Sequence, residues 1–143
     1  MSDDRDLPTA EAQARGFDRV RGAHAREIAE DYVELIADLI DHEGEARAVA
    51  LAERFGVTAA TVNNTIKRLE REGLVQSRPY RSIFLTDEGR ALAEDCRARH
   101  QLVTAVLMAL GVDQVTAEAD AEGIEHHVSR ATLRAFRKFL DTQ

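Results

Sequence analysis

Residues 46–74, ARAVALAERFGVTAATVNNTIKRLEREGL, decide the fold of the N-terminal half of the chain. Gly56-Val57 predicts a turn, and Thr58 is a good N-cap for the helix that follows it. Apolar side chains recur at helical spacing on both sides of this turn, at Val49, Ala52 and Phe55 and then at Val62, Ile66 and Leu69. Gly73 is placed to end the second helix. Two helices joined by a short turn with glycine predict a helix-turn-helix.

The outward face of the second predicted helix is polar and basic. It carries Thr61, Asn63, Asn64 and Lys67. Short polar and basic side chains can contact base edges and phosphates in the major groove of DNA. These four residues are therefore candidates for DNA binding.

A predicted β-hairpin follows the second helix. Two runs with strand character, at 74–77 and 82–85, enclose the turn Arg78-Pro79-Tyr80-Arg81. A hairpin directly after a recognition helix is the wing of a winged helix. We expect Arg78, Tyr80 and Arg81 at its tip to contact phosphates or the minor groove.

The regions on either side of this stretch predict a mainly α protein. One helix is expected at about 24–42, before Gly44, and three more at about 86–110, at 113–127 and after Ser129. Residues 1–22 are polar and predict a mobile N-terminal tail. We therefore expect a winged helix-turn-helix DNA-binding domain at 23–93, with its small β-hairpin wing, and a helical C-terminal domain at 94–143.

Charge and composition narrow the class of protein. The net charge is -7, but residues 47–90 carry eight Lys/Arg against five Asp/Glu, whereas the remainder carries eleven against twenty-one. A single cysteine, Cys96, excludes an internal disulfide and a cysteine-based zinc site. No apolar run is long enough to cross a bilayer, and the first residues lack the features of a signal peptide. We expect a cytoplasmic protein with no membrane partner.

A second informative stretch is DAEGIEHH at residues 120–127. On a helix, Glu122, Glu125 and His126 stand at i, i+3 and i+4, so they share one face. Two carboxylates and one imidazole suit a divalent first-row metal. The pattern alone leaves open a solvated acidic face without a ligand. The apolar spacing of the helix expected at about 24–42 likewise predicts only that Asp31 and Glu34 are solvated acids.

Several motifs together resemble the manganese-responsive branch of the DtxR family of metal-dependent transcription factors. The motifs are IAEDYVELI, GVTAATVNNTIKRLEREGL, the wing with FLTDEG, ARHQLV and DAEGIEHHVS, and they follow the order and spacing of the family. The resemblance covers nearly the whole chain after the tail. It implies a C-terminal domain that binds metal and forms a homodimer, and a double-stranded DNA partner with a palindromic operator.

The resemblance also implies a ligand set. Its members are Asp31, Glu34, His100, Glu122, Glu125 and His126. The branch holds two nearby Mn(II) ions per subunit, and hard oxygen donors suit Mn(II). The iron-responsive branch has Met in place of Asp31 and Cys in place of Glu122, and it has a further C-terminal domain that this sequence, which ends at residue 143, does not show.

These observations predict a Mn(II)-activated repressor that controls manganese uptake genes, with no enzymatic activity and no small-molecule substrate. The alternatives are an iron-responsive regulator of the same family, a di-metal carboxylate enzyme and a winged-helix adaptor that binds protein. The enzyme class requires paired Glu-x-x-His motifs, which this chain lacks. An adaptor leaves the polar and basic recognition face unexplained.

Overall fold

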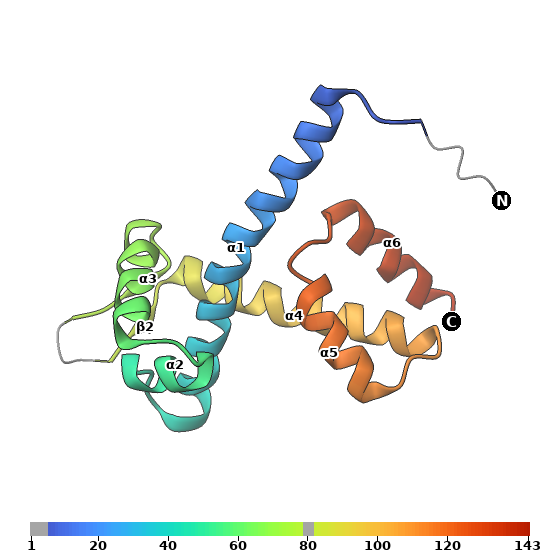
Figure 1. Cartoon of the computed structure of the whole chain (residues 1–143). Coiled ribbons are helices and arrows are strands. Elements are labelled where there is room, and N and C mark those ends of the chain that lie inside the picture. The colour runs from blue at the N-terminus through green and yellow to red at the C-terminus, as the bar shows by residue number, and fades with distance from the viewer. Residues whose placement is uncertain (1–5, 79–81) are drawn as a thin grey trace.

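The computed structural model describes residues 6–78 and 82–143, which form a mainly α fold, as predicted (Figure 1). The elements are α1 (Ala10–Glu43), α2 (Ala48–Phe55), α3 (Ala59–Arg71), β1 (Val75–Gln76), β2 (Phe84–Leu85), α4 (Asp87–Ala109), α5 (Gln114–Ile124) and α6 (Arg130–Asp141). None of the helices within the described ranges combines the length and the apolar character that a bilayer-spanning segment needs.

The predicted helix-turn-helix is formed by α2 and α3. Gly56 ends α2 with φ 68°, a left-handed conformation that glycine adopts at little cost. Thr58 caps α3, because its hydroxyl accepts a hydrogen bond of 3.1 Å from the Thr61 amide. The predicted core positions Val62, Ile66 and Leu69 are buried. Val49 is different: it is 71% exposed, and Leu51 is the buried residue of α2.

The predicted hairpin is present as an antiparallel pair of strands, with Val75 opposite Leu85. A β-bridge between Ala46 and Ile83 attaches it to the segment before α2. The hairpin also lies tight against the start of α4, where a Cβ on Gly89 would stand 2.0 Å from the Leu74 carbonyl oxygen. The wing tip residues Pro79–Arg81, including the predicted DNA contacts Tyr80 and Arg81, lie outside the described residues.

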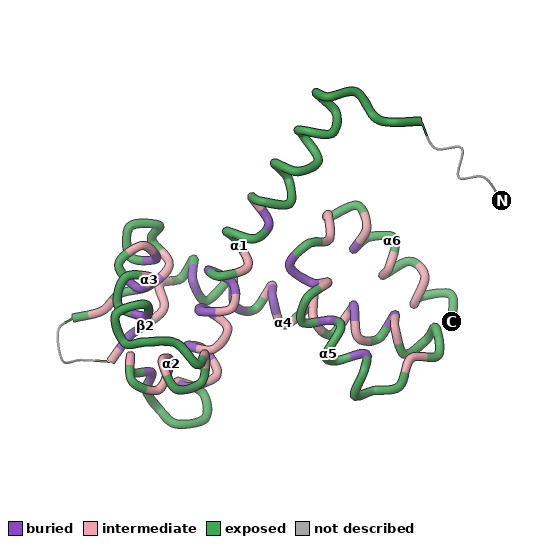
Figure 2. Tube along the Cα trace, viewed as in Figure 1, coloured by how far each residue is buried: buried purple, intermediate pink, exposed green. Residues whose placement is uncertain are grey.

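Helix α1 begins at Ala10, well before the start predicted near residue 24. Thr9 caps it by accepting a hydrogen bond of 3.1 Å from the Ala12 amide. Residues 10–21, which we call the arm, are all exposed, and they extend away from the rest of the fold (Figure 2). The arm lacks an apolar stripe, but it is rich in alanine and arginine, which have high helix propensity.

Helices α1 and α4 join the two halves of the molecule. Val33 and Ala37 of α1 pack against Ala93 of α4. On one side, Tyr32, Ile36 and Leu39 of α1 belong to the core of the winged helix. On the other side, α4 continues into the C-terminal half, where Val103 packs with Ala121 of α5 and Leu133 of α6. The later part of α1 therefore lies beside the first turns of α4, and α4 leads from the winged helix to α5 and α6.

Candidate metal centre

The six predicted ligands come from three parts of the fold that meet between the two halves. Asp31 and Glu34 lie on α1, and His100 lies on α4. Glu122 is in the last turn of α5, and Glu125 and His126 follow in the turn after it. The Glu125 amide still donates a hydrogen bond of 2.9 Å to the Ala121 carbonyl, so the helical spacing of this motif is kept across the end of α5.

One cluster of donor atoms joins α4 to α5. His100 Nδ1 lies 2.8 Å from Glu125 Oε2 and 3.4 Å from Glu122 Oε1. One atom from each of these three residues lies within 4.8 Å of the others, which is a separation that one metal ion can bridge. His100, which its helical position alone would assign to the core, thus faces two carboxylates.

A second cluster joins α1 to the turn after α5. His126 Nε2 lies 3.0 Å from Asp31 Oδ1 and 3.4 Å from Glu125 Oε1. Glu27, which the motifs did not indicate, brings a third ligand atom within 4.8 Å of Asp31 and His126. Glu125 lies between the two clusters, because its two carboxylate oxygens face different histidines.

Among the six predicted ligands, two buried atoms make no hydrogen bond within the described part of the protein. They are His126 Nε2 and Glu125 Oε1. Asp31 Oδ1 lies 3.0 Å from His126 Nε2, but the two groups are not oriented to form a hydrogen bond. An unsatisfied buried polar atom costs about 1–3 kcal/mol. A cation between these atoms would satisfy both, so the residues present fit a divalent metal.

The electrostatics also favour a cation. Burial raises the pKa of Glu34 to about 7 and that of Glu125 to about 8, and the negative charge of Glu122 adds to both shifts. Burial lowers the pKa of His126, but the carboxylates of Asp31 and Glu30 outweigh it and raise this pKa to about 10. The carboxylates are therefore too concentrated to be fully ionised without added positive charge.

Glu34 belongs to neither cluster among the described residues. It lines a cleft with Asp31 and Glu122, next to Arg54 and Phe55. The predicted ligands are thus gathered at one place, with Glu34 at its open side.

Glu30 and Arg99 support the centre, and the motifs did not indicate either residue. His126 Nδ1 donates a hydrogen bond of 2.7 Å to Glu30 Oε2, so the ring is held with Nε2 towards Asp31. Arg99 lies 2.9 Å from the same Glu30 oxygen and donates a hydrogen bond of 2.8 Å to the Glu125 carbonyl. Burial would raise the pKa of Glu30, but these two partners keep it below the ordinary value. Such contacts orient a metal-binding histidine.

Helical spacing could have indicated Glu30. It stands at i−3 and i−7 from Val33 and Ala37, on the face of α1 that packs against α4. Its side chain is accordingly buried. An acid on a buried helix face requires a partner, and Arg99 and His126 supply it. Cys96 is fully buried, and burial raises the pKa of its thiol.

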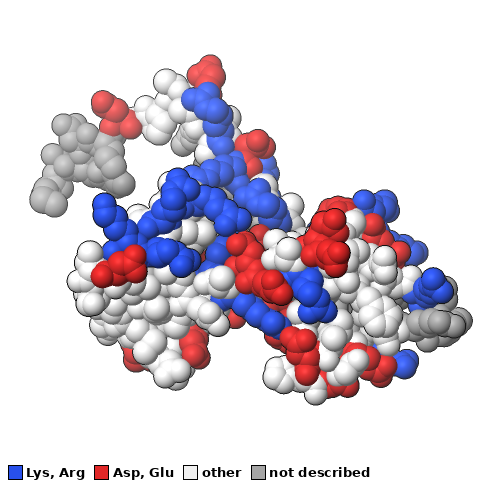
Figure 3. Space-filling model, turned by 180° about the vertical axis from the view of Figure 1, so that it is seen from behind, with Lys and Arg blue, Asp and Glu red and all other residues white. Residues whose placement is uncertain are grey.

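The predicted DNA-binding residues of α3 all lie on its exposed face. These are Thr61, Asn63, Asn64 and Lys67, and Arg78 at the start of the wing is exposed as well. Lys and Arg side chains also gather over α6 and the adjoining part of α1 (Figure 3). On α6 they are Arg130, Arg134, Arg137 and Lys138. Residues outside 47–90 carry a net negative charge, so a count of charges along the sequence does not reveal this second basic surface.

Comparison with protein families gives two matches along the chain. Residues 25–83 match the model described as the N-terminal DNA-binding domain of iron-dependent repressors. Residues 86–142 match the model described as the metal-binding and dimerisation domain of the same repressors. The families are those of transcriptional regulators, which bears out the prediction that the chain is not an enzyme.

Individual relatives agree with this assignment. The chain is 52% identical over 133 residues to the transcriptional regulator MntR of Escherichia coli O6:H1, covering 93% of this chain and 86% of the relative. It is 51% identical to MntR of Salmonella typhimurium, with 93% and 85% covered. It is 36% identical to the HTH-type transcriptional regulator MntR of Oceanobacillus iheyensis, with 70% and 68% covered.

Solved structures of similar fold lead to the same family. A manganese-dependent transcriptional repressor in complex with manganese has a TM-score of 0.71 and 31% identity, covering 80% of this chain and 53% of that one. The manganese regulator SloR has a TM-score of 0.69 and 29% identity, covering 80% and 54%. This chain therefore spans about half the length of these solved regulators. With two matching domain models and about half identity to MntR regulators over most of its length, the chain belongs to the iron-dependent repressor, or DtxR, family of transcriptional regulators.

Proposed function

We propose that this chain is a Mn(II)-activated repressor that binds operator DNA as a homodimer in the cytoplasm and controls genes for manganese uptake. The observation that carries the proposal is the meeting of four carboxylates and two imidazoles where α1, α4 and α5 converge. Oxygen-rich sites favour Mn(II), which competes poorly in sites rich in nitrogen or sulfur. The names of its MntR relatives and of the manganese-dependent repressor of similar fold support the same metal.

We infer two Mn(II) ions in each subunit. His100 and Glu122 would hold one ion, and Asp31 and His126 would hold the other. Glu125 supports this division, because its oxygens face the two clusters separately. Glu34, which lines the adjacent cleft, would be the sixth ligand. The bound ions would supply positive charge and a link between helices.

The helices that carry the ligands suggest how metal controls DNA binding. Asp31 and Glu34 lie on α1, which also packs Tyr32 and Ile36 into the core of the winged helix. The other four candidates belong to the C-terminal half. Binding of metal would therefore restrict the position of α3 relative to the dimerisation domain. In the dimer, two α3 helices about one DNA turn apart would read a palindromic operator.

Metal-dependent DNA binding tests the function directly. A duplex is first selected by the protein from a random pool in the presence of Mn(II), and its binding is then followed by fluorescence anisotropy in metal-buffered solution. We expect Mn(II) to activate binding at free concentrations where Mg(II) and Ca(II) have no effect. Equal activation by Mg(II), or DNA binding that is equally strong with and without metal, would overturn the proposal. Stronger activation by Fe(II) would favour the iron-responsive alternative.

The raised pKa values predict that Mn(II) binding becomes tighter as the pH rises. Below about pH 7, Glu34, Glu125 and His126 all hold protons that an incoming ion must displace. Affinity should therefore rise about tenfold per pH unit for each displaced proton while the pH is below the pKa of that group, and the rise should become less steep above about pH 7, where Glu34 is already ionised. Calorimetry in buffers of different ionisation enthalpy counts these protons. Glu34→Gln should lower the count, and an Mn(II) affinity that is independent of pH would contradict the prediction.

The division of the predicted DNA-binding residues into phosphate contacts and base contacts gives a further prediction. Arg78→Ala should weaken binding to all sequences alike and reduce the salt dependence by about one unit of slope for each phosphate that the protein no longer neutralises. Asn63→Ala and Asn64→Ala should instead change the ranking of mutated operators, because amide side chains read base edges. The measurement is a set of titrations against operator variants at several salt concentrations. Identical specificity profiles for the two kinds of variant would refute the assignment.

A further inference from the structure

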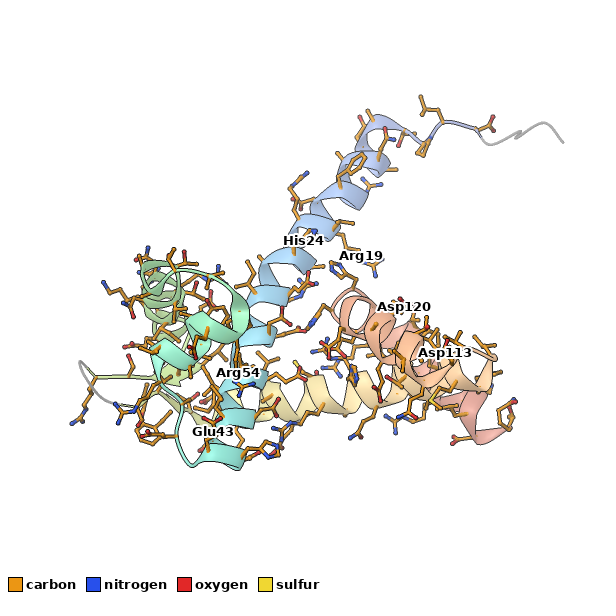
Figure 4. The ribbon with its side chains drawn as sticks, turned by 60° about the horizontal axis from the view of Figure 1, so that its bottom comes forward. Arg19, His24, Glu43, Arg54, Asp113 and Asp120 are labelled. Carbon is orange, nitrogen blue, oxygen red and sulfur yellow. The ribbon has the colours of Figure 1, made fainter. Side chains whose placement is uncertain are left out.

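Three side chains outside the six manganese candidates lie together where α1 passes the end of α5, and one of them, Glu27, also borders the second cluster. His24 and Glu27 are on α1, and His127 is in the turn after α5 (His24 is labelled in Figure 4). Glu27 Oε2 lies 3.2 Å from His24 Nδ1 and 3.1 Å from His127 Nε2. One ligand atom from each of the three lies within 4.8 Å of the others.

The fold holds these side chains in place from both sides. His24 and Glu27 stand at i and i+3 on α1, so they are neighbours on the helix surface. His127 directly follows His126, whose ring is fixed by its hydrogen bond to Glu30. The rings of His24 and His127 meet edge to face, with centroids 5.3 Å apart. Both histidines thus direct a nitrogen at the same carboxylate oxygen.

We propose that His24, Glu27 and His127 form a separate binding site for Zn(II). Two imidazoles and one carboxylate are a nitrogen-rich set, and Zn(II) is commonly held by three such ligands with a fourth position open to water. Bonds of about 2.0–2.1 Å in a tetrahedron place neighbouring donor atoms roughly 3.3 Å apart. The two measured separations, 3.1 and 3.2 Å, agree with this spacing. The proposal does not depend on the proposed repressor function.

The two sites differ in chemistry as well as position. The manganese candidates include four carboxylates, whereas this site has two nitrogen donors and one carboxylate. Nitrogen donors favour Zn(II) over Mn(II) in the general order of metal affinity. His24 is also well exposed, with 71% of its side chain accessible, so an ion can enter from solvent. Zinc here would join the base of the arm to the C-terminal half.

The test compares the Zn(II) content of the full chain with that of single variants. His24→Ala removes one ligand from an exposed helix position. His42→Ala is the matched control, because it removes an exposed histidine from the last turn of the same helix. Competition against a chromogenic chelator should show one more tightly bound Zn(II) per chain in the wild type and His42→Ala than in His24→Ala. We expect at least about a 10-fold loss of affinity at this site.

Two further measurements separate this site from the manganese centre. His127→Gln should lose the same single ion as His24→Ala. With Co(II) as a spectroscopic probe, the intense visible bands of a four-coordinate ion should be present in the wild type and absent in His24→Ala. Equal Zn(II) counts in the wild type and His24→Ala would overturn the proposal and leave a hydrogen-bonded cluster without metal. Because the readout is a difference between variants, ions at the other ligands do not affect it.

Discussion

Replacing Asp31 by alanine is expected to remove most of the gain in DNA affinity that Mn(II) provides, a loss of about 5- to 150-fold for a typical coupling free energy of about 1–3 kcal/mol. Asp31 lies on α1 of the winged-helix half, and its Oδ1 is 3.0 Å from His126 Nε2 of the C-terminal half. His100, Glu122 and Glu125 are unchanged in the variant and should still hold an ion. The variant should therefore still bind Mn(II), but Mn(II) should no longer raise its affinity for DNA as much as in the wild type.

Two titrations check this expectation. Calorimetry measures Mn(II) binding, and anisotropy measures DNA binding with and without Mn(II). Asp18→Ala is the matched control, because it removes an exposed acid from the arm of the same helix, where its ionic contact is with Arg21. The Asp18→Ala control should keep the full increase in DNA affinity that Mn(II) provides. An Asp31→Ala variant with the gain of the wild type would remove Asp31 from the mechanism and put the link between the halves in doubt.

Local chemistry explains which parts of the fold were predictable. The cap predicted at Thr58 is correct because a hydroxyl satisfies an amide only three residues away. The apolar spacing of α3 is likewise a property of one segment. The arm of α1 was missed because its helix buries almost nothing and rests on residue propensity, which an apolar pattern does not detect.

The candidate centre was predictable in part, for a physical reason. Glu122, Glu125 and His126 form a pattern within five residues, so their shared face can be deduced from spacing. Asp31 and His100 lie far away in the sequence, and the family resemblance was the signal for both. Contacts such as that of Glu30 with His126 join residues 96 positions apart and depend on the packing of α1 against the C-terminal half. No periodicity in one helix contains that information.

The buried pair of Glu30 and Arg99 carries the largest expected effect on stability. Their side chains are 7% and 11% exposed, and Arg99 Nη2 lies 2.9 Å from Glu30 Oε2. Arg99→Met leaves the Glu30 carboxylate buried with His126 as its remaining partner. We expect the free energy of unfolding to fall by about 3 kcal/mol, because the buried Glu30 carboxylate loses one of its two cationic partners and the Glu125 carbonyl loses its Arg99 donor. Urea denaturation at one protein concentration, with chelator present, measures this loss.

Arg97→Met is the matched control, because this arginine also joins α4 to α1. Arg97 pairs with Asp38 and Asp41, but all three side chains are more than a third exposed. Solvent screens such pairs, so the control should lose less than about 1 kcal/mol. Equal losses for the two arginines would show that burial of the charge is not the cause.

A double variant separates stability from the positioning of the metal ligand. Glu30→Leu combined with Arg99→Met removes both buried charges, and most of the stability should return, since replacing both partners of a buried pair by apolar groups is often nearly neutral. The ring of His126 would then lack the acceptor that holds its Nδ1. Mn(II) affinity should therefore stay about 10- to 100-fold below that of the wild type even in the stable double variant. Recovery of both stability and Mn(II) affinity would mean that Glu30 has no part in orienting His126.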